Sequence, residues 1–230
     1  MKDKENNPCV NNLFVCKYLD RLRALQQNHF MTASISAVDI SKRFRKHSLF
    51  SDISFTCSAG ESFAVTGPNG SGKSTLLKIL AKLSAPTKGA VAFYIDGKTI
   101  PEEDIRRYVG FCSPELNLYE NLTGLENLQF ACGLEKKSLA ESLADFQLKG
   151  HENKLVRFYS SGMKQRLKIL CAVINRPPLL FLDEPGFALD EQGKKLIYET
   201  VEKLRESSAI ILATNESAEA AMCGRRIELG

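Results

Sequence analysis

The segment from Gly67 to Thr75 constrains the fold of this chain more than any other feature. It reads Gly-Pro-Asn-Gly-Ser-Gly-Lys-Ser-Thr, after an alternating run at residues 62–66 and before an apolar run at residues 76–80. This pattern predicts a strand, a glycine-rich loop and a helix. Glycine lets the backbone turn sharply, so the loop N–H groups and the positive end of the helix can surround a polyphosphate. The alternative is a glycine-rich surface turn with a solvated lysine.

Within this loop, two side chains have predicted contacts of their own. Lys73 is expected to reach the β- and γ-phosphates of a bound nucleotide, and the Ser74 hydroxyl is expected to hold Mg²⁺. The predicted nucleotide-binding positions are Gly67, Pro68, Asn69, Gly70, Ser71, Gly72, Lys73, Ser74 and Thr75.

Length and composition favour one domain with an inserted subdomain. The chain has 230 residues, of which 43% are hydrophobic and 25% are charged. This is enough to bury one substantial core. The net charge of +4 comes without a basic block, so nucleic acid is not expected as a partner.

The cysteine spacing and the length of the apolar runs indicate the cellular compartment. Seven cysteines form no C-x-x-C pair, which favours reduced thiols in a cytosolic protein. The sequence has no apolar run of the length that a membrane-spanning helix needs, and its first 30 residues lack the apolar core of a signal peptide. Residues 1–31 are expected to be a separate extension, either disordered with a short amphipathic helix or the product of a mis-assigned start codon before Met31.

The order of patterns along the chain predicts an α/β fold. Short strands with period-2 alternation are expected between residues 35 and 65, a helix at 73–83, a hairpin around 90–97 and a strand at 108–112. Residues 113–176 are mostly helical in pattern. A strand at 179–182, a helix at 190–206, a strand at 209–213, a short helix at 217–223 and a strand near 226–229 complete the chain.

These elements predict a P-loop NTPase: a RecA-like core with N-terminal antiparallel β strands and an inserted α-helical subdomain. The core is expected to comprise residues 32–112 and 177–230, and the helical subdomain residues 113–176.

A second candidate site follows the apolar run at residues 179–182. Such a run is typical of a central parallel strand that is buried on both faces, and Asp183-Glu184 lies at its carboxyl end, where open α/β sheets bind ligands. Asp183 is expected to contact Mg²⁺, either directly or in its second coordination sphere, and Glu184 to polarise the attacking water. The alternative is that two carboxylates simply begin a loop.

At this point the sequence resembles the ATP-binding subunits of ABC transporters, over about residues 35–230. Residues 121–128 match the segment that opens the family's helical subdomain, and residues 159–166 lie where the family has its signature, with Ser160 and Gly162 retained. The resemblance implies that the signature of one subunit binds the ATP held by another, in a homodimer or a pair of ABC ATPases. Phe44 lies where the family has an aromatic residue that stacks on adenine; packing in the core is its alternative role.

Several positions depart from the family pattern. Pro114 stands where the family has a Mg²⁺-contacting glutamine, and the neighbouring Glu115 is the candidate substitute ligand, with a solvated loop carboxylate as the alternative. Asn215 stands where the family has a histidine that contacts the γ-phosphate. An amide can donate a hydrogen bond but cannot carry charge. Loss of a charge-assisted bond would cost roughly 1.5–3 kcal/mol, on the order of ten- to a hundredfold in rate.

The resemblance therefore implies an ATPase that uses ATP and Mg²⁺ to power transport through separate integral membrane subunits. The subunit is expected on the cytoplasmic face of the membrane. Its compact body is most similar to the haem exporter ATPase of cytochrome c maturation, with compact drug-type or ABC-2-type exporters as alternatives. A soluble ATP-binding switch with weak hydrolysis, and a DNA-repair or translation-factor ATPase, are alternatives from other classes.

Overall fold

The computed structural model describes residues 32–45, 47–132 and 136–230. The expectations for residues 1–31 fall outside this part of the chain. Nine strands are labelled: β1 (Ala33–Phe44), β2 (His47–Ser58), β3 (Ser62–Thr66), β4 (Lys88–Ile95), β5 (Lys98–Thr99), β6 (Val109–Cys112), β7 (Leu179–Asp183), β8 (Ala209–Ala213) and β9 (Arg225–Glu228). The helices are α2 (Lys73–Leu80), η1 (Glu102–Arg107), α3 (Gly124–Cys132), α4 (Lys136–Asp145), η2 (Val156–Phe158), α5 (Ser161–Val173), α6 (Glu191–Arg205) and α7 (Ser217–Ala220).

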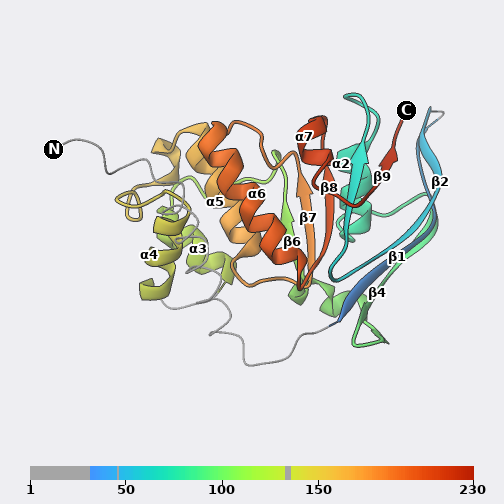
Figure 1. The fold of residues 1–230 in the computed structure, drawn as a ribbon, viewed down its shortest axis with the longest axis horizontal. Helices are drawn as coiled ribbons and strands as arrows, with labels where there is room; N and C mark the ends of the chain where they lie inside the picture. The colour runs from blue at the N-terminus through green and yellow to red at the C-terminus, as the bar shows by residue number, and fades with distance from the viewer. Residues whose placement is uncertain (1–31, 46, 133–135) are drawn as a thin grey trace.

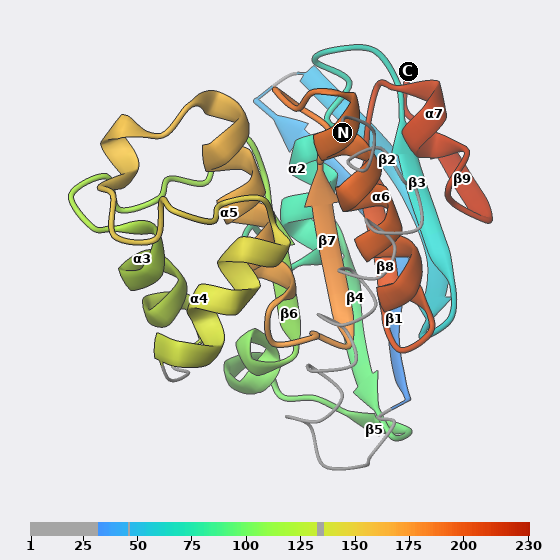
Figure 2. The same ribbon diagram turned by 60° about the vertical axis from the view of Figure 1, so that its left-hand side comes forward.

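A five-stranded parallel sheet forms the centre of the molecule, in the order β6-β7-β8-β3-β9 (Figures 1 and 2). Its middle strands are buried on both faces, because alternate residues enter two different cores. Leu180, Leu182 and Ile210 pack with α5 and α6 on one face. Leu179, Phe181 and Ile211 pack with α2 and the N-terminal strands on the other. The continuous apolar run of β7 is explained by this double burial.

The second sheet is antiparallel, in the order β2-β1-β4-β5, and covers the α2 side of the parallel sheet (Figure 1). The alternation in β1 buries Ala33, Ile35 and Ala37 on its inner face. The prediction of short strands was wrong here, because β1 and β2 each run for 12 residues. Register shifts along the pair, one of them between Ala37 and Ile40, let the strands continue through irregular backbone.

Helices α3, α4 and α5 gather to one side of the parallel sheet (Figure 2). Their facing side chains form an apolar core that includes Leu128, Leu143 and Leu167. The first of these helices begins with a capping box: Thr123 N donates to Glu126 Oε2 at 2.8 Å, and Glu126 N donates to Thr123 Oγ1 at 3.2 Å. The helical pattern at residues 113–176 is thus realised by short helices that share one core.

The helix after the glycine-rich loop ends earlier than the predicted residue 83. Lys82 takes a left-handed φ of 57°, and its N–H donates to Ile79 O at 3.0 Å. Leu83 N donates to Lys78 O at 2.8 Å. These bonds form a Schellman ending, which satisfies the last carbonyl groups and turns the chain away. The prediction was too long because the apolar residue Leu83 continues the helical pattern beyond the end of the helix.

Candidate nucleotide-binding site

The candidate site residues come together because the carboxyl ends of three parallel strands share one edge. Val65 of β3 and Asp183 of β7 both pair with Ala213 of β8. The glycine-rich loop therefore follows β3 at the same edge where Glu184 follows β7 and Asn215 follows β8. In open α/β sheets this is the edge that binds ligands.

The loop from Gly67 to Gly72 is shaped as a phosphate cradle. Gly67 has a φ of 140°, and a Cβ there would lie 2.2 Å from the backbone oxygen of Leu229, so no other residue fits without movement. Lys73 is only 5% exposed, and its Nζ donates to Gly67 O at 2.8 Å and Pro68 O at 3.1 Å. Helix α2 begins after Gly72 without a side-chain cap, which leaves its first N–H groups for an anion.

Asp183 and Ser74 meet at the base of this cradle. A hydrogen bond joins the Ser74 side chain to Asp183, across 109 residues of sequence. The Asp183 side chain is 3% exposed, and its Oδ1 finds no hydrogen-bond partner among the described residues. Burial raises the pKa of Asp183, and the bond from Ser74 opposes this shift. The Ser74 hydroxyl and the unpartnered Asp183 oxygen are both hard oxygen donors, which suit a divalent cation such as Mg²⁺.

Glu184 and Asn215 lie side by side at the same edge. The Asn215 Nδ2 group donates to Glu184 Oε1 at 3.4 Å and also to Asn69 Oδ1 of the glycine-rich loop. Glu184 has a left-handed φ of 48°, which is uncommon for a residue with a side chain and is held by its N–H bond to Ala213 O at 2.8 Å. One amide thus links the loop to the candidate catalytic carboxylate.

The remaining predicted residues lie around this centre. The Glu115 carboxylate forms an ion pair with Lys78 of α2, and Glu115 also acts electrostatically on Asp183. Phe44 is 55% exposed at the end of β1, so the alternative of core packing is not observed. The Lys42 ammonium lies 5.1 Å from the centre of its ring. The β1–β2 hairpin end lies beside the loop, since Leu49 would be 2.6 Å from a Cβ at Gly72.

Ser160 and Gly162 lie at the start of α5, on the other face of the parallel sheet from the helix α2 that follows the phosphate loop. Ser160 caps α5 by accepting a bond from Met163 N at 3.2 Å. Helix α5 packs in the core on one face of the sheet, whereas α2 packs in the core on the other. Among the described residues, neither Ser160 nor Gly162 forms a hydrogen bond to the phosphate loop of its own chain.

Three residues that contact the site were not predicted from the sequence. Gln165 is a buried polar residue of α5, and its Nε2 donates to Pro185 O at 3.1 Å. Lys168 Nζ donates to Pro114 O at 2.7 Å. Glu219 is 1% exposed and accepts from Gly186 N at 2.8 Å. A polar residue at an otherwise apolar helical position was the available signal for Gln165.

Comparison with known proteins decides the family. Residues 50–186, more than half of the chain, match the family described as ABC transporter. The chain belongs to the ABC transporter family. It is an ATPase cassette of the P-loop type, so the predicted fold class is confirmed.

Several relatives of this cassette carry functional names. It is 34% identical over 194 residues to the linearmycin resistance ATP-binding protein LnrL of Bacillus subtilis strain 168, covering 80% of this chain and 62% of that protein. It is 31% identical over 180 residues to the lantibiotic transport ATP-binding protein SrtF of Streptococcus pyogenes, covering 77% of each. It is 33% identical over 197 residues to the cytochrome c biogenesis ATP-binding export protein CcmA of Xanthomonas axonopodis pv. citri, covering 84% of this chain and 91% of that one.

Solved structures agree with this assignment. The dimeric structure of MJ0796, a bacterial ABC transporter cassette, superimposes with a TM-score of 0.75 at 26% identity, covering 85% of this chain and 94% of that one. A post-hydrolysis state of the same cassette bound to ADP and Pi gives a TM-score of 0.74 at 27% identity, with the same coverage. In the part of the chain that the structure describes, no helix has the length and apolar character needed to cross a bilayer.

Proposed function

We propose that this cassette binds Mg–ATP between the phosphate loop and Asp183, and that hydrolysis at Glu184 powers an ABC transporter. The observation that supports it most is the meeting of Ser74 with Asp183, whose Oδ1 has no partner among the described residues. A nucleotide triphosphatase needs phosphate donors and a carboxylate for the metal in one place. Both are present at one edge of this sheet.

Several residues bind the triphosphate in this proposal. Lys73 would exchange its bonds to Gly67 O and Pro68 O for the β- and γ-phosphates, since the same ammonium cannot satisfy both sets of acceptors. The N–H groups at the start of α2 add a neutral, directional set of donors. Ser74 and Asp183 would hold the Mg²⁺, with Glu115 as a third candidate once its ion pair with Lys78 opens. Bound Mg²⁺ neutralises charge on the phosphate oxygens.

Glu184 is the proposed general base. It follows the end of β7 with a left-handed backbone, and Asn215 donates to its carboxylate at 3.4 Å. A water beside this carboxylate would be oriented for attack on the γ-phosphate. Asn215, which also reaches Asn69, would donate a hydrogen bond to a phosphate oxygen in place of the family's histidine. Phe44 is the proposed stacking surface for adenine.

The proposed assembly is a dimer, either of two copies or with another ABC ATPase, docked on integral membrane subunits at the cytoplasmic face of the membrane. The likeness to a dimeric cassette supports the dimer. In such a dimer Ser160 and Gly162 would contact the ATP of the other subunit, which fits the packing of α5 and α2 on opposite faces of the sheet. We extend the proposal to export, with haem handling in cytochrome c biogenesis as the favoured subtype. The support is the similarity to the cytochrome c biogenesis export protein CcmA, which this chain matches over 91% of that protein's length.

The test uses the purified full chain and its Glu184→Gln variant. We expect measurable Mg–ATP hydrolysis by the wild type and almost none by the variant, because glutamine cannot take a proton from water. The variant should also dimerise on size-exclusion chromatography when ATP and Mg²⁺ are present. Equal, near-zero hydrolysis by both proteins without ATP-dependent dimers would instead favour an ATP-binding switch. An undiminished rate in the variant would refute the role of Glu184.

A further inference from the structure

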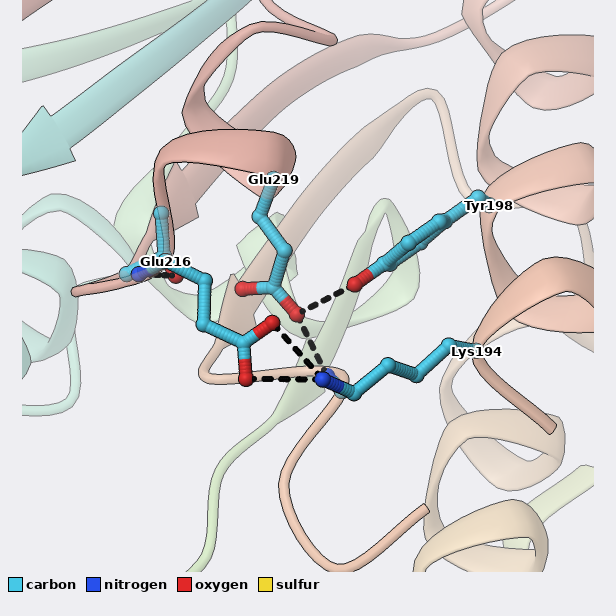
Figure 3. Close-up of polar contacts among 6 residues, drawn as sticks. Lys194, Tyr198, Glu216 and Glu219 are labelled. Carbon is cyan, nitrogen blue, oxygen red and sulfur yellow. Dashed lines mark hydrogen bonds and ion pairs between the residues drawn. The ribbon is translucent and has the colours of Figure 1, made fainter. Parts of the chain in front are cut away.

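A buried carboxylate lies behind the candidate site, outside the residues proposed to bind ATP or the metal. It belongs to Glu219 of α7, which is 1% exposed (Figure 3). Its Oε1 accepts from Gly186 N at 2.8 Å and from the Tyr198 hydroxyl at 3.2 Å. The Thr214 side chain also hydrogen-bonds to it. One side chain therefore joins the loop after β7, the helix α6 and the end of β8.

The contact with Gly186 leaves no room for another residue. A Cβ at Gly186 would lie 2.4 Å from Glu219 Oε1 and 3.1 Å from the Tyr198 hydroxyl oxygen. The preceding residue, Pro185, is held from elsewhere, since Gln165 Nε2 of α5 donates to its oxygen at 3.1 Å. The segment that directly follows Glu184 is thus fixed by side chains from two different helices.

The segment that carries Asn215 is tied to the same network. Thr214, immediately before it, is 1% exposed and bonds to Glu219. Glu216, immediately after it, donates its N–H to Thr214 Oγ1 at 2.9 Å. The Glu216 carboxylate also accepts from Lys194 Nζ of α6 at 2.8 and 3.0 Å (Figure 3). Asn215 is therefore held on both sides by residues that contact Glu219 or α6.

From these contacts we propose that Glu219 is a positioning residue for ATP hydrolysis, which sets the distance between the Glu184 carboxylate and the Asn215 amide. The proposal rests on the function proposed above for Glu184. Gly186 is two residues from Glu184, and Thr214 adjoins Asn215, so one buried carboxylate bonds to the backbone of one loop and the side chain of the other. A misplacement of about 1 Å can cost on the order of a hundredfold in rate. Loss of Glu219 should therefore slow the chemical step and leave the phosphate loop intact.

The experiment compares Glu219→Ala and Glu219→Gln in the full chain, with Glu202→Gln as a matched control. Glu202 is an exposed carboxylate of α6 that pairs with Arg205 and not with Glu219, Tyr198 or Lys194. Steady-state hydrolysis gives kcat and KM, and calorimetric titration with Mg–ATP in a Glu184→Gln background gives the affinity. We expect Glu219→Ala to lower kcat by about ten- to a hundredfold with little change in affinity. Glu219→Gln should restore most of the rate, because its amide oxygen can still accept from Gly186 N and Tyr198.

Tyr198→Phe provides a second test if Glu219→Ala does not fold. It removes one donor to Glu219 and keeps the ring, so kcat should fall about two- to fivefold at unchanged KM. Wild-type kcat in Glu219→Ala, or in Tyr198→Phe where that variant alone folds, would overturn the inference. Equal losses of rate and ATP affinity in Glu219→Ala and Glu219→Gln would also overturn it, because they indicate general damage to the fold.

The parallel Glu184→Gln assay separates the two proposals. If that variant is inactive while Glu219→Ala keeps the wild-type rate, only the positioning inference fails. If Glu184→Gln hydrolyses ATP as fast as the wild type, the proposed base itself is wrong.

Discussion

Asn215 offers the sharpest test of how charge contributes to this site. Its amide donates to Glu184 Oε1 at 3.4 Å and to Asn69 Oδ1, so it is placed between the candidate base and the phosphate loop. An amide is neutral at every pH, whereas an imidazole with an ordinary pKa of about 6.5 gains a positive charge below it. We predict that Asn215→His raises kcat for ATP hydrolysis, and does so most at low pH.

The expected magnitude follows from the hydrogen bonds involved. A bond between neutral groups contributes about 0.5–1.5 kcal/mol, and a bond that involves a charged group about 1.5–3 kcal/mol. Replacing a neutral donor with a charged one should therefore gain about 1–1.5 kcal/mol, or roughly five- to tenfold in kcat. Above the imidazole pKa the gain should largely disappear, since a neutral ring donates no better than the amide.

The assay is phosphate release at saturating Mg–ATP between pH 5.5 and 8.5. The quantity to follow is the ratio of the Asn215→His rate to the wild-type rate, because this cancels any pH dependence that the two proteins share. Asn215→Ala serves as the control and should fall about two- to tenfold below the wild type. A ratio that stays flat with pH, or stays below one throughout, would refute the reasoning.

Three further predictions concern the loop, the helical core and one thiol. Gly67→Ala should destabilise the chain by at least about 1 kcal/mol and weaken ATP binding, because its Cβ would lie 2.2 Å from Leu229 O; an unchanged urea midpoint would contradict this. Phe146→Ala should cost about 3–5 kcal/mol in chemical denaturation, since the ring is 1% exposed in the helical core; a loss below about 1 kcal/mol would contradict it. Burial raises the pKa of the Cys112 thiol to about 12, and the residue is 0% exposed. At pH 8, alkylation followed by mass spectrometry should therefore label Cys112 slowly in the native chain and rapidly after unfolding; fast native labelling would contradict this.

The parts of the fold that sequence reasoning found are those with a strong local pattern. The strand β8 (Ala209–Ala213) has the predicted bounds, and β7 exceeds its predicted range by Asp183 alone. Both are short apolar runs between clear breaks, as buried parallel strands require. The glycine-rich loop and its helix were predictable for a similar reason, since glycine spacing and helical period occur in one stretch.

The parts that sequence reasoning missed depend on local backbone or on distant contacts. Asp39 and Asp52 take left-handed conformations inside β1 and β2, and such residues read as turns in a sequence although pairing resumes beyond them. The contact of Glu219 with Gly186 spans 33 residues. A side chain that bonds to a distant backbone N–H leaves no period or spacing in the sequence, so only the folded chain reveals it.

The dependence of ATP affinity on Mg²⁺ tests the central claim most directly. Calorimetric titrations of the wild type, Asp183→Asn and Lys73→Ala with ATP, in Mg²⁺ and in EDTA, measure whether the loop and the buried carboxylate act on one ligand. We predict that Mg²⁺ tightens wild-type binding by about tenfold or more, that Asp183→Asn loses most of this gain, and that Lys73→Ala binds weakly in both conditions. A full Mg²⁺ gain in Asp183→Asn, or wild-type affinity in Lys73→Ala, would contradict the claim.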